Sequence, residues 1–240
     1  MAKNEYYSYD AIDATGANYR IVIGERSNGK TYGFKKKAFD NWLYNGKQFA
    51  YLRRFAEEIL LKRVGNYWND IMPYITEQLT PLYPEYAGFT ITSRTGEWTV
   101  CGLSKNGNKT VLGTIGYYFA LNQTQYDKSV SYPDVNLICF EEFLTNKLEL
   151  RDEMTQFQNF ISTIKRKRTD MTVYLLGNTV NRNSQILTGM NINVRDLTQG
   201  QIHKYSYIGE ENITNTVAIE WCRHYEQEED SEAFFIFNNQ

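Results

Sequence analysis

The hydrophobic and polar positions of this 240-residue chain follow two periods, and each period predicts one kind of element. Short apolar runs rich in β-branched and aromatic residues predict strands, and apolar residues spaced three and four apart predict helices. The runs typical of strands are residues 19–23, 47–53, 135–142 and 171–176, and the helical segments are residues 32–44, 56–71, 149–168 and 213–225. Because the two kinds largely alternate along the chain, we expect an α/β fold with a central, mainly parallel sheet.

A different pattern interrupts this alternation in the middle of the chain. Residues 89–93 and 97–102 alternate apolar and polar side chains around Arg94-Thr95-Gly96, which predicts a β-hairpin. Asn106-Gly107 predicts a second turn, after which residues 110–121 can return as a third strand. We therefore expect an antiparallel β insertion within the α/β domain.

Two other regions have a weaker pattern. Pro73, Pro81 and Pro84 break the chain after the second helical segment, so we expect a connection rich in loops there. After Val180 the periodicity fades, with short alternating pieces over residues 191–207 and a strand-like run over residues 233–237. We expect one domain over residues 1–195, and a linker or a small C-terminal subdomain over residues 196–240.

The first strand runs into a glycine-rich pattern that ends in a lysine and a threonine. The pattern is G-x-x-x-x-G-K-T, and its residues are Gly24, Glu25, Arg26, Ser27, Asn28, Gly29, Lys30 and Thr31. A strand before it and a helix after it are the context of a phosphate-binding P-loop. The glycines allow the backbone to approach a phosphate closely, and the loop N–H groups face the anion. We expect Lys30 to bind the β- and γ-phosphates of a nucleotide, and the hydroxyl of Thr31 to bind Mg²⁺.

A second buried strand, residues 135–142, ends in two acids, Glu141 and Glu142. The carboxyl ends of strands are where α/β sheets bind ligands, and acids at that edge can hold Mg²⁺ and poise a water molecule beside a P-loop. Taken alone, two acids after an apolar strand usually mark the place where a strand meets solvent. With Lys30 and Thr31 upstream in the same chain, the functional interpretation is favoured.

Two further polar features allow two interpretations each. The helix over residues 149–168 ends in Lys165-Arg166-Lys167-Arg168. These cations either compensate the negative end of the helix dipole or supply an arginine finger to the γ-phosphate of a neighbouring subunit, and the pattern supports both equally. Asn178 follows the strand over residues 171–176, where it either senses the γ-phosphate or belongs to a simple turn.

Composition narrows the range of functions. The net charge of −2 gives no support to a protein that coats DNA alone, although several subunits can each present one or two cations to a shared duplex. No apolar run approaches the length of a membrane span, and the N-terminus lacks an apolar signal core. We therefore expect neither a membrane span nor export.

The cysteines, histidines and N-terminal tyrosines also carry expectations. Three widely separated cysteines are expected to be buried, reduced thiols: Cys101, Cys139 and Cys222. His203 and His224 lack the spacing of zinc ligands. Tyr6, Tyr7 and Tyr9 can stack on an adenine, although such side chains more often pack in a core.

Several motifs together resemble one protein family. They are the P-loop, Tyr51-Leu52-Arg53-Arg54, Ile138-Cys139-Phe140-Glu141-Glu142-Phe143, Gly46-Lys47-Gln48-Phe49 and Asn66-Tyr67-Trp68-Asn69-Asp70. From about residue 19 to residue 179, the chain resembles the genome-packaging (DNA-encapsidation) ATPases of small short-tailed bacteriophages, relatives of the large terminase motors. The resemblance implies a P-loop α/β fold of the additional-strand-catalytic-glutamate type.

The resemblance also implies roles for single residues. Lys30 and Thr31 take the phosphate and Mg²⁺ positions, Glu141 takes the Mg²⁺-associated acid, and Glu142 takes the base that orients the attacking water. Arg166 matches a trans-acting arginine finger, Lys128 matches a second trans-acting cation, and Asn178 matches the polar residue after the sensing strand. The family usually has Asp-Glu where this chain has Glu-Glu. Its members also carry a nuclease-like domain that would begin about where this chain stops, so the chain is either a truncated piece or a compact relative.

The implied function is to drive double-stranded DNA into a prohead, with ATP and Mg²⁺ as cofactors. Such proteins work as a homo-oligomeric ring, taken to be a pentamer, on the portal. The implied location is the host cytoplasm and, transiently, the portal vertex of the prohead, and the use of a packaging RNA is left open. Candidate DNA contacts are Lys62, Arg63, Lys105 and Lys109, although a solvated surface position is the commoner explanation for any one of them.

Two other functions stay open at the level of sequence. A small-molecule kinase shares the P-loop, but it needs an acceptor pocket and an Arg-rich lid that closes in cis, a role that residues 165–168 can serve. A nucleotide-dependent assembly scaffold would bind nucleotide with little turnover. A kinase forms a phosphorylated product, a motor releases phosphate in response to DNA or prohead, and a scaffold does neither.

Overall fold

A computed structural model describes residues 6–127, 130–146, 149–179, 184–208 and 214–223 of the chain. The expectations for Lys128, His224 and residues 226–237 lie outside these residues. The described helices are α1 (Asp10–Asp13), α2 (Lys30–Asn45), α3 (Leu61–Val64), α4 (Met72–Leu79), α5 (Glu153–Lys165) and α6 (Gln185–Gly189), with short 3₁₀ turns η1 (Ala56–Ile59), η2 (Asn69–Ile71), η3 (Leu121–Asp127) and η4 (Val194–Asp196). Among the described helices, none combines the length and hydrophobicity needed to cross a bilayer.

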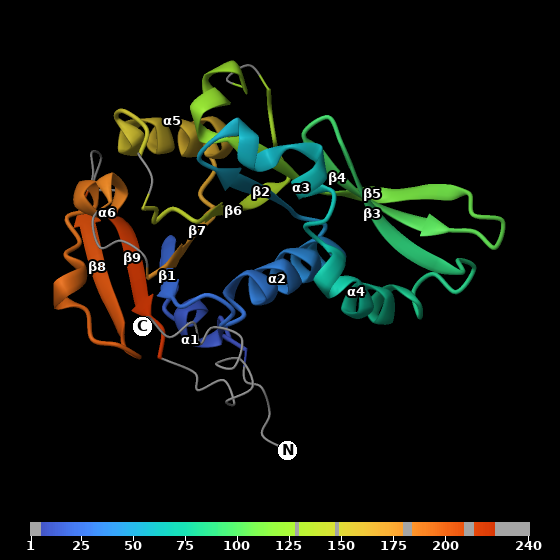
Figure 1. Cartoon of the computed structure of the whole chain (residues 1–240), viewed down its shortest axis with the longest axis horizontal. Coiled ribbons are helices and arrows are strands. Elements are labelled where there is room, and N and C mark those ends of the chain that lie inside the picture. Colours follow the sequence, from blue (N-terminus) through green and yellow to red (C-terminus); the bar gives the residue numbers. More distant parts are fainter. Residues whose placement is uncertain (1–5, 128–129, 147–148, 180–183, 209–213, 224–240) are drawn as a thin grey trace, which may run out of the picture.

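The described strands form one sheet in the order β3-β4-β5-β2-β6-β7-β1-β9-β8 (Figure 1). They are β1 (Tyr19–Gly24), β2 (Gln48–Arg53), β3 (Gly88–Arg94), β4 (Glu97–Leu103), β5 (Lys109–Ala120), β6 (Val135–Glu141), β7 (Thr172–Asn178), β8 (Ile202–Ile208) and β9 (Thr214–Trp221). The pairs from β5 through β2, β6, β7 and β1 to β9 are parallel. This confirms the expected α/β fold. The strand β7 lies between β1 and β6, which is the additional strand that the resemblance implies.

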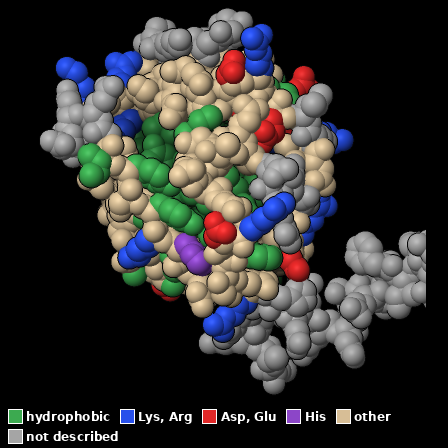
Figure 2. All heavy atoms as spheres, turned by 90° about the vertical axis from the view of Figure 1, so that its left-hand side faces the viewer, with side chains coloured by type: hydrophobic (Ala, Val, Ile, Leu, Met, Phe, Trp, Pro, Cys, Tyr) green, Lys and Arg blue, Asp and Glu red, His purple; other side chains and the backbone are tan. Residues whose placement is uncertain are grey.

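Helices cover both faces of the sheet because its central strands are apolar on both sides. Successive side chains of a strand point to opposite faces, so Val22 belongs to the hydrophobic cluster that includes residues of α2 and α4, while Ile21 and Ile23 belong to the cluster that includes residues of α5 and α6. In Figure 1, α2 and α5 lie on opposite sides of the strands. The left-hand face of Figure 1, where β8 and α6 lie, shows hydrophobic side chains in a hollow and scattered charges of both signs (Figure 2). The described residues of this face therefore do not form a continuous basic surface (Figure 2).

The antiparallel insertion is confirmed as an arm of three strands that extends to the right in Figure 1. The pairs β3–β4 and β4–β5 are antiparallel. The long strand β5 then continues into the body of the sheet, where residues 116–120 pair in parallel with β2. The arm is therefore part of the central sheet, because one strand belongs to both.

The prediction of one continuous helix over residues 56–71 is wrong. The segment instead divides into η1, α3 and η2, and Leu60 between the first two has an extended backbone, with φ −57° and ψ 146°. The indole Nε1 of Trp98 donates a hydrogen bond of 2.8 Å to the carbonyl of Val64, which takes an acceptor that a continuing helix would use. Burial of Trp68 in the same aromatic cluster favours this broken path over the local helical period.

Pro73 was expected to break the chain, but it lies in the first turn of α4. A proline is tolerated there because the first N–H groups of a helix have no partner within the helix. The expected end of α2 at Asn45-Gly46 is confirmed, since Gly46 caps the helix with a left-handed backbone of φ 63°.

The prediction of a helix over residues 213–225 is also wrong, because residues 214–221 of this segment form β9. Val217, Ala218 and Ile219 are all buried, as in a strand with both faces covered, and β9 pairs in parallel with β1. The short run of apolar residues does not separate a buried strand from a buried helix by period alone. The proposed boundary near residue 196 does not interrupt the sheet, and it stays a prediction about where a further unit would begin.

Candidate functional site

The P-loop lies at the carboxyl end of β1, and its two glycines are required by the space around them. A Cβ atom on Gly24 would lie 2.5 Å from Nδ2 of Asn28, and a Cβ atom on Gly29 would lie 2.6 Å from the ring of Tyr6. Gly29 also has a φ of 85° immediately before the first residue of α2, a conformation that favours glycine. Gly29 is therefore required by its backbone conformation, and a side chain at Gly24 would have to displace Asn28 and crowd Cys222.

Lys30 is nearly buried, and its ammonium group lies inside the loop. Nζ donates to the carbonyls of Gly24 (3.2 Å) and Glu25 (2.7 Å), and to the side-chain oxygens of Asn28 (3.2 Å) and Asn178 (3.0 Å). Asn178 reaches Lys30 because β7 pairs with β1 in a register that places Gly24 opposite Asn178. Burial lowers the pKa of Lys30, while Cys222 and the nearby glutamates oppose this shift.

The strand β6 brings Glu141 to the P-loop from 110 positions away in the chain. The hydroxyl of Thr31 donates a hydrogen bond to Oε1 of Glu141, and the hydroxyl of Tyr51 donates to Oε2 at 2.5 Å. Burial raises the pKa of Tyr51 well above its usual value, and Glu141 raises it further. The hydroxyl of Tyr51 therefore stays a donor at neutral pH and fixes one oxygen of Glu141, so that the other faces Thr31.

These positions fit a magnesium ion. Mg²⁺ prefers oxygen ligands, and beside nucleotides it is commonly bound by one or two protein groups, substrate phosphates and water. Thr31 and Glu141 offer such groups side by side. Within the described residues there is no group of three or more His, Cys, Asp or Glu that could hold a metal ion, so phosphate and water oxygens would complete the shell.

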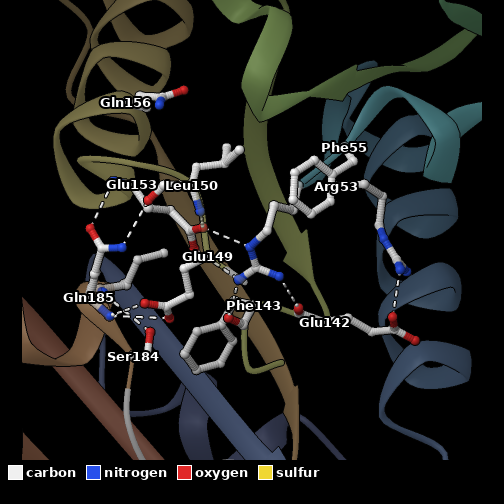
Figure 3. Close-up of polar contacts among 12 residues, drawn as sticks. Arg53, Phe55, Glu142, Phe143, Glu149, Leu150, Glu153, Gln156, Ser184 and Gln185 are labelled. Atoms are coloured by element: carbon white, nitrogen blue, oxygen red, sulfur yellow. Dashed lines mark hydrogen bonds and ion pairs between the residues drawn. The ribbon is translucent and has the colours of Figure 1, made fainter. Parts of the chain in front are cut away.

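Glu142 lies at the mouth of the site and is half exposed. Its backbone is left-handed, with φ 56°, and Nη2 of Arg53 contacts its Oε2 at 2.6 Å (Figure 3). The same guanidinium also contacts Glu58 at 3.0 Å and lies 3.6 Å from Glu141. Burial opposes the charge on Arg53, but its acidic neighbours and Tyr51 raise its pKa above the usual value. Arg53 is thus a permanent cation among three carboxylates.

Arg53 and Tyr51 are site residues that the sequence analysis missed. Both lie in the motif that carries the family resemblance, but neither has a role assigned there. Their position follows from strand order, because β2 pairs directly with β6 and places Leu52 opposite Phe140. The strand end at Arg53 therefore meets the acids at the end of β6. A prediction of which strands are neighbours would have found them.

Arg166 does not join this site within one chain. It caps the C-terminal end of α5, is exposed, and donates to the carbonyl of Val130 at 2.9 Å. The helix α5 leads from the carboxyl end of β6 to the beginning of the parallel strand β7, so its last turn lies at the amino edge of the sheet, opposite the P-loop. Residues 165–168 therefore do not act as a lid over their own P-loop in this arrangement.

The other residues that the sequence singled out are either exposed at the surface or buried in the hydrophobic core. Lys62 and Arg63 are exposed on α3, and Lys105 and Lys109 are exposed where β4 turns into β5. Tyr7 and Tyr9 are buried, which confirms the packing interpretation for these two, while Tyr6 is exposed and stacks on Tyr32 with ring centroids 5.3 Å apart. A cavity of about 670 Å³ begins beside this pair and follows α2. Cys101, Cys139 and Cys222 are buried free thiols, as expected.

The strand order and the meeting of Lys30, Thr31 and Glu141 define a P-loop NTPase of the additional-strand-catalytic-glutamate class. The chain belongs to the Podovirus DNA encapsidation protein (Gp16) family, whose model matches residues 1–193. This confirms the resemblance seen in the sequence.

The individual proteins that this chain resembles are also phage DNA packaging proteins. The chain is 30% identical over 176 residues to the DNA packaging protein of Bacillus phage B103, an alignment that covers 72% of this chain and 46% of the relative. The chain thus spans about half the length of the curated relatives it matches. In fold, it is similar to the N-terminal domain of the DNA packaging ATPase from bacteriophage phi29, with a TM-score of 0.65, 22% identity, and coverage of 90% of this chain and 95% of that chain. The Phi-28 gp11 DNA packaging motor gives a TM-score of 0.68 with 24% identity, covering 95% of this chain and 62% of that chain.

Proposed function

We propose that this chain is the ATP-hydrolysing part of a viral DNA packaging motor, and that hydrolysis of Mg-ATP takes place at the interface between subunits. The observation that carries the proposal is the division of the predicted residues between two edges of the sheet. Lys30, Thr31 and Glu141 meet at the carboxyl edge, whereas Arg166 lies at the amino edge. A finger at that position can complete a site on another subunit but not its own. The family and its named packaging relatives support the motor over other P-loop functions.

In this proposal each residue has a distinct task. Residues 24–29 and Lys30 bind the triphosphate, and Thr31 and Glu141 hold Mg²⁺, which supplies charge neutralisation for the transferring phosphoryl group. Glu142 accepts a proton from the attacking water and orients it. Asn178, already bonded to Lys30, reports the presence of the γ-phosphate to β7. Arg166 of a neighbouring subunit stabilises the developing charge, and Lys128 supplies a second cation in trans.

The proposed partners follow from the same assignment. A homo-oligomeric ring, proposed to be a pentamer, sits on the portal of the prohead in the host cytoplasm and translocates double-stranded DNA. With a net charge of −2 per chain, grip on the duplex comes from a few cations of each subunit, such as Lys62, Arg63, Lys105 and Lys109. A packaging RNA is compatible with this assembly.

A mixing experiment tests the trans arrangement. The variant Arg166→Ala keeps its own site but lacks the finger, and Glu142→Gln keeps the finger but lacks the catalytic acid. Each alone is expected to lose ATPase activity when assembled on proheads with DNA. In a 1:1 mixture, about one quarter of the interfaces pair an intact site with an intact finger, so activity is expected to return to roughly that share. Failure of the mixture to regain activity, or full activity of Arg166→Ala alone, rejects the trans finger.

Two controls separate the proposal from its rivals. Arg195→Ala removes an exposed arginine in η4 to which the proposal gives no role, and it is expected to keep wild-type activity. A phosphorylated small molecule among the products would identify a kinase, which the position of residues 165–168 disfavours. Nucleotide binding with no difference in turnover between wild type and Glu142→Gln would identify a scaffold.

A further inference from the structure

A buried ion pair lies directly behind Glu142, and the proposed chemistry makes no use of it. Nε of Arg54 contacts Oε2 of Glu153 at 2.7 Å, and its Nη2 contacts Oε1 at 2.9 Å. Both side chains are almost completely removed from solvent, with 4% and 0% exposure. A buried pair of charges is weak evidence for stability, because desolvation offsets most of the attraction. We therefore expect this ion pair to have a role other than stabilising the fold.

The same guanidinium holds the backbone at the catalytic acid. Nη1 of Arg54 donates to the carbonyl of Glu142 at 3.3 Å, and Nη2 donates to the carbonyl of Phe143 at 2.6 Å. Glu142 is in the left-handed region, which residues with a Cβ atom seldom adopt and which persists only where the surroundings hold it. Arg54 supplies part of that hold through the two carbonyls, while its neighbour Arg53 contacts the Glu142 side chain (Figure 3).

Glu153 is fixed in turn by the beginnings of two helices. Its Oε2 also accepts from the backbone N–H of Leu150 at 2.9 Å, and its own N–H donates to the side chain of Gln185 at 3.0 Å. Gln185 bonds back to the carbonyl of Leu150 at 2.8 Å, and its N–H contacts the carboxylate of Glu149 (Figure 3). The carboxylate of Glu153 is thus held by Arg54 and by the N–H of Leu150 just before α5, and its backbone N–H is held by the first residue of α6.

We propose that Arg54 and Glu153 are positioning residues that hold the backbone of Glu142 in its left-handed conformation, so that its carboxylate meets the attacking water at the P-loop. This inference rests on the proposed ATPase function. Arg54 is held by Glu153, Glu153 is held by α5 and α6, and the loop that carries Glu142 is thereby anchored to the rigid helix layer. Neither side chain touches the nucleotide. Their loss lowers the rate of hydrolysis and leaves nucleotide binding largely intact.

The test compares Glu153→Gln and Arg54→Lys with Asp13→Asn in the full chain assembled on proheads. Asp13, at the end of α1, forms ion pairs with Arg20 of β1 and Lys37 of α2, so its variant loses comparable contacts without touching the Glu142 loop. Loss of positioning is expected to lower kcat about 10- to 100-fold for Glu153→Gln, because small displacements of a catalytic group cost rates of this order. The Kd for a fluorescent ATP analogue is expected to stay within about threefold. Arg54→Lys keeps the charge, but one ammonium group cannot replace the fork that contacts Glu153 and both carbonyls, so a loss of kcat of similar size is expected. Asp13→Asn keeps both constants.

A double-mutant cycle with Glu142→Gln separates positioning from general support of the fold. If Glu153 acts through Glu142, adding Glu153→Gln to Glu142→Gln lowers the residual rate no further. Multiplicative losses in the double variant, or a parallel loss of nucleotide binding, reject the positioning role and leave a structural one. The cycle also shows whether Glu142 contributes to turnover at all.

Hydrogen exchange gives a readout that does not depend on ATP hydrolysis. In Glu153→Gln, peptides spanning residues 141–146 are expected to exchange faster than in wild type, while the same peptides in Asp13→Asn are unchanged. Unchanged exchange in Glu153→Gln overturns the inference even if activity falls. Faster exchange in a protein whose wild type hydrolyses no ATP retains the anchoring of the loop and rejects the proposed function instead.

Discussion

Replacement of Tyr51 by phenylalanine removes one hydroxyl from behind the predicted magnesium site and leaves the rest of the ring in place. Tyr51 is buried, and its ring packs against Tyr67 and Trp98 with centroid distances of 4.7 and 5.6 Å. Those contacts survive in phenylalanine. What is lost is the 2.5 Å hydrogen bond to Oε2 of Glu141, whose other oxygen accepts from Thr31.

The size of the effect follows from the kind of bond that is lost. A hydrogen bond to a charged group contributes about 1.5–3 kcal/mol, which corresponds to roughly 10- to 150-fold in an equilibrium constant. Removal of a residue that orients a metal ligand typically lowers the metal affinity about 10- to 100-fold. We therefore expect Tyr51→Phe to need roughly 10 to 100 times more Mg²⁺ for half-maximal stimulation of ATP binding. Binding of ATP without Mg²⁺ is expected to change little, because Lys30 and the loop amides are untouched.

The assay is binding of a fluorescent ATP analogue across a series of Mg²⁺ concentrations, including chelator alone. The matched control is Tyr118→Phe, since Tyr118 lies in the same aromatic cluster but its hydroxyl accepts from the N–H of Gly96 at 3.1 Å instead of contacting Glu141. Equal shifts of the Mg²⁺ dependence in Tyr51→Phe and Tyr118→Phe, or no shift in Tyr51→Phe, would contradict this prediction.

Three other predictions concern stability and reactivity. Phe49 is completely buried among aromatic rings, so Phe49→Ala is expected to lower the free energy of unfolding by about 3–5 kcal/mol, whereas Tyr44→Ala at an exposed position changes it by less than about 0.5 kcal/mol in urea titrations. Burial opposes the charge on Glu58, but Arg53 outweighs burial and holds the pKa of this carboxyl below its usual 4.5. The ionised Glu58 therefore stabilises the fold above about pH 4.5, and this stabilisation is lost as the pH falls through the lowered pKa. Glu58→Gln should be less stable than wild type at pH 7, and the two proteins should become equally stable in acid. Unfolding curves at pH 7 and pH 3 that differ by equal amounts contradict this. Burial raises the pKa of Cys222 to about 12 and that of Cys139 well above its usual value. A thiol reagent at pH 7 should therefore react slowly with the native protein, and it should label three thiols once the protein is unfolded. Rapid labelling of the native protein contradicts this.

The location of Arg166 bears on how a ring of these subunits would work. In the proposed arrangement, a site made of Lys30 and Glu142 from one chain and a cation from the next would link turnover in one subunit to the placement of its neighbour. The helix α5 begins at Glu153, beside the Glu142 loop, and ends at Lys165, directly before Arg166. One rigid element therefore runs between the site of its own chain and the edge that would face a neighbour.

Much of the fold was predictable because its signals are local. Strand β1, the P-loop and α2 follow from three apolar residues, two glycines and a helical period, and the structure places all of them as expected. The hairpin of β3 and β4 was equally clear, since alternation and a turn around Thr95-Gly96 fix it within a few residues. The segments that failed were residues 56–71 and 213–225, whose apolar residues fit more than one period. Their structure depends on Trp98 and on β1, which are distant in the sequence.

The candidate site shows the same division. The sequence determined which chemical groups the protein has for a nucleotide, because Lys30, Thr31 and the pair Glu141-Glu142 are each marked by their immediate neighbours along the chain. Only the tertiary structure decided that Tyr51 and Arg53 contact those acids, that Asn178 reaches Lys30, and that Arg166 lies at the opposite edge. A motif depends on a few adjacent residues, whereas the order of strands in a sheet depends on long-range pairing that no single segment encodes. For that reason the chemistry was legible in the sequence, and the placement of its groups at opposite edges of the sheet was not.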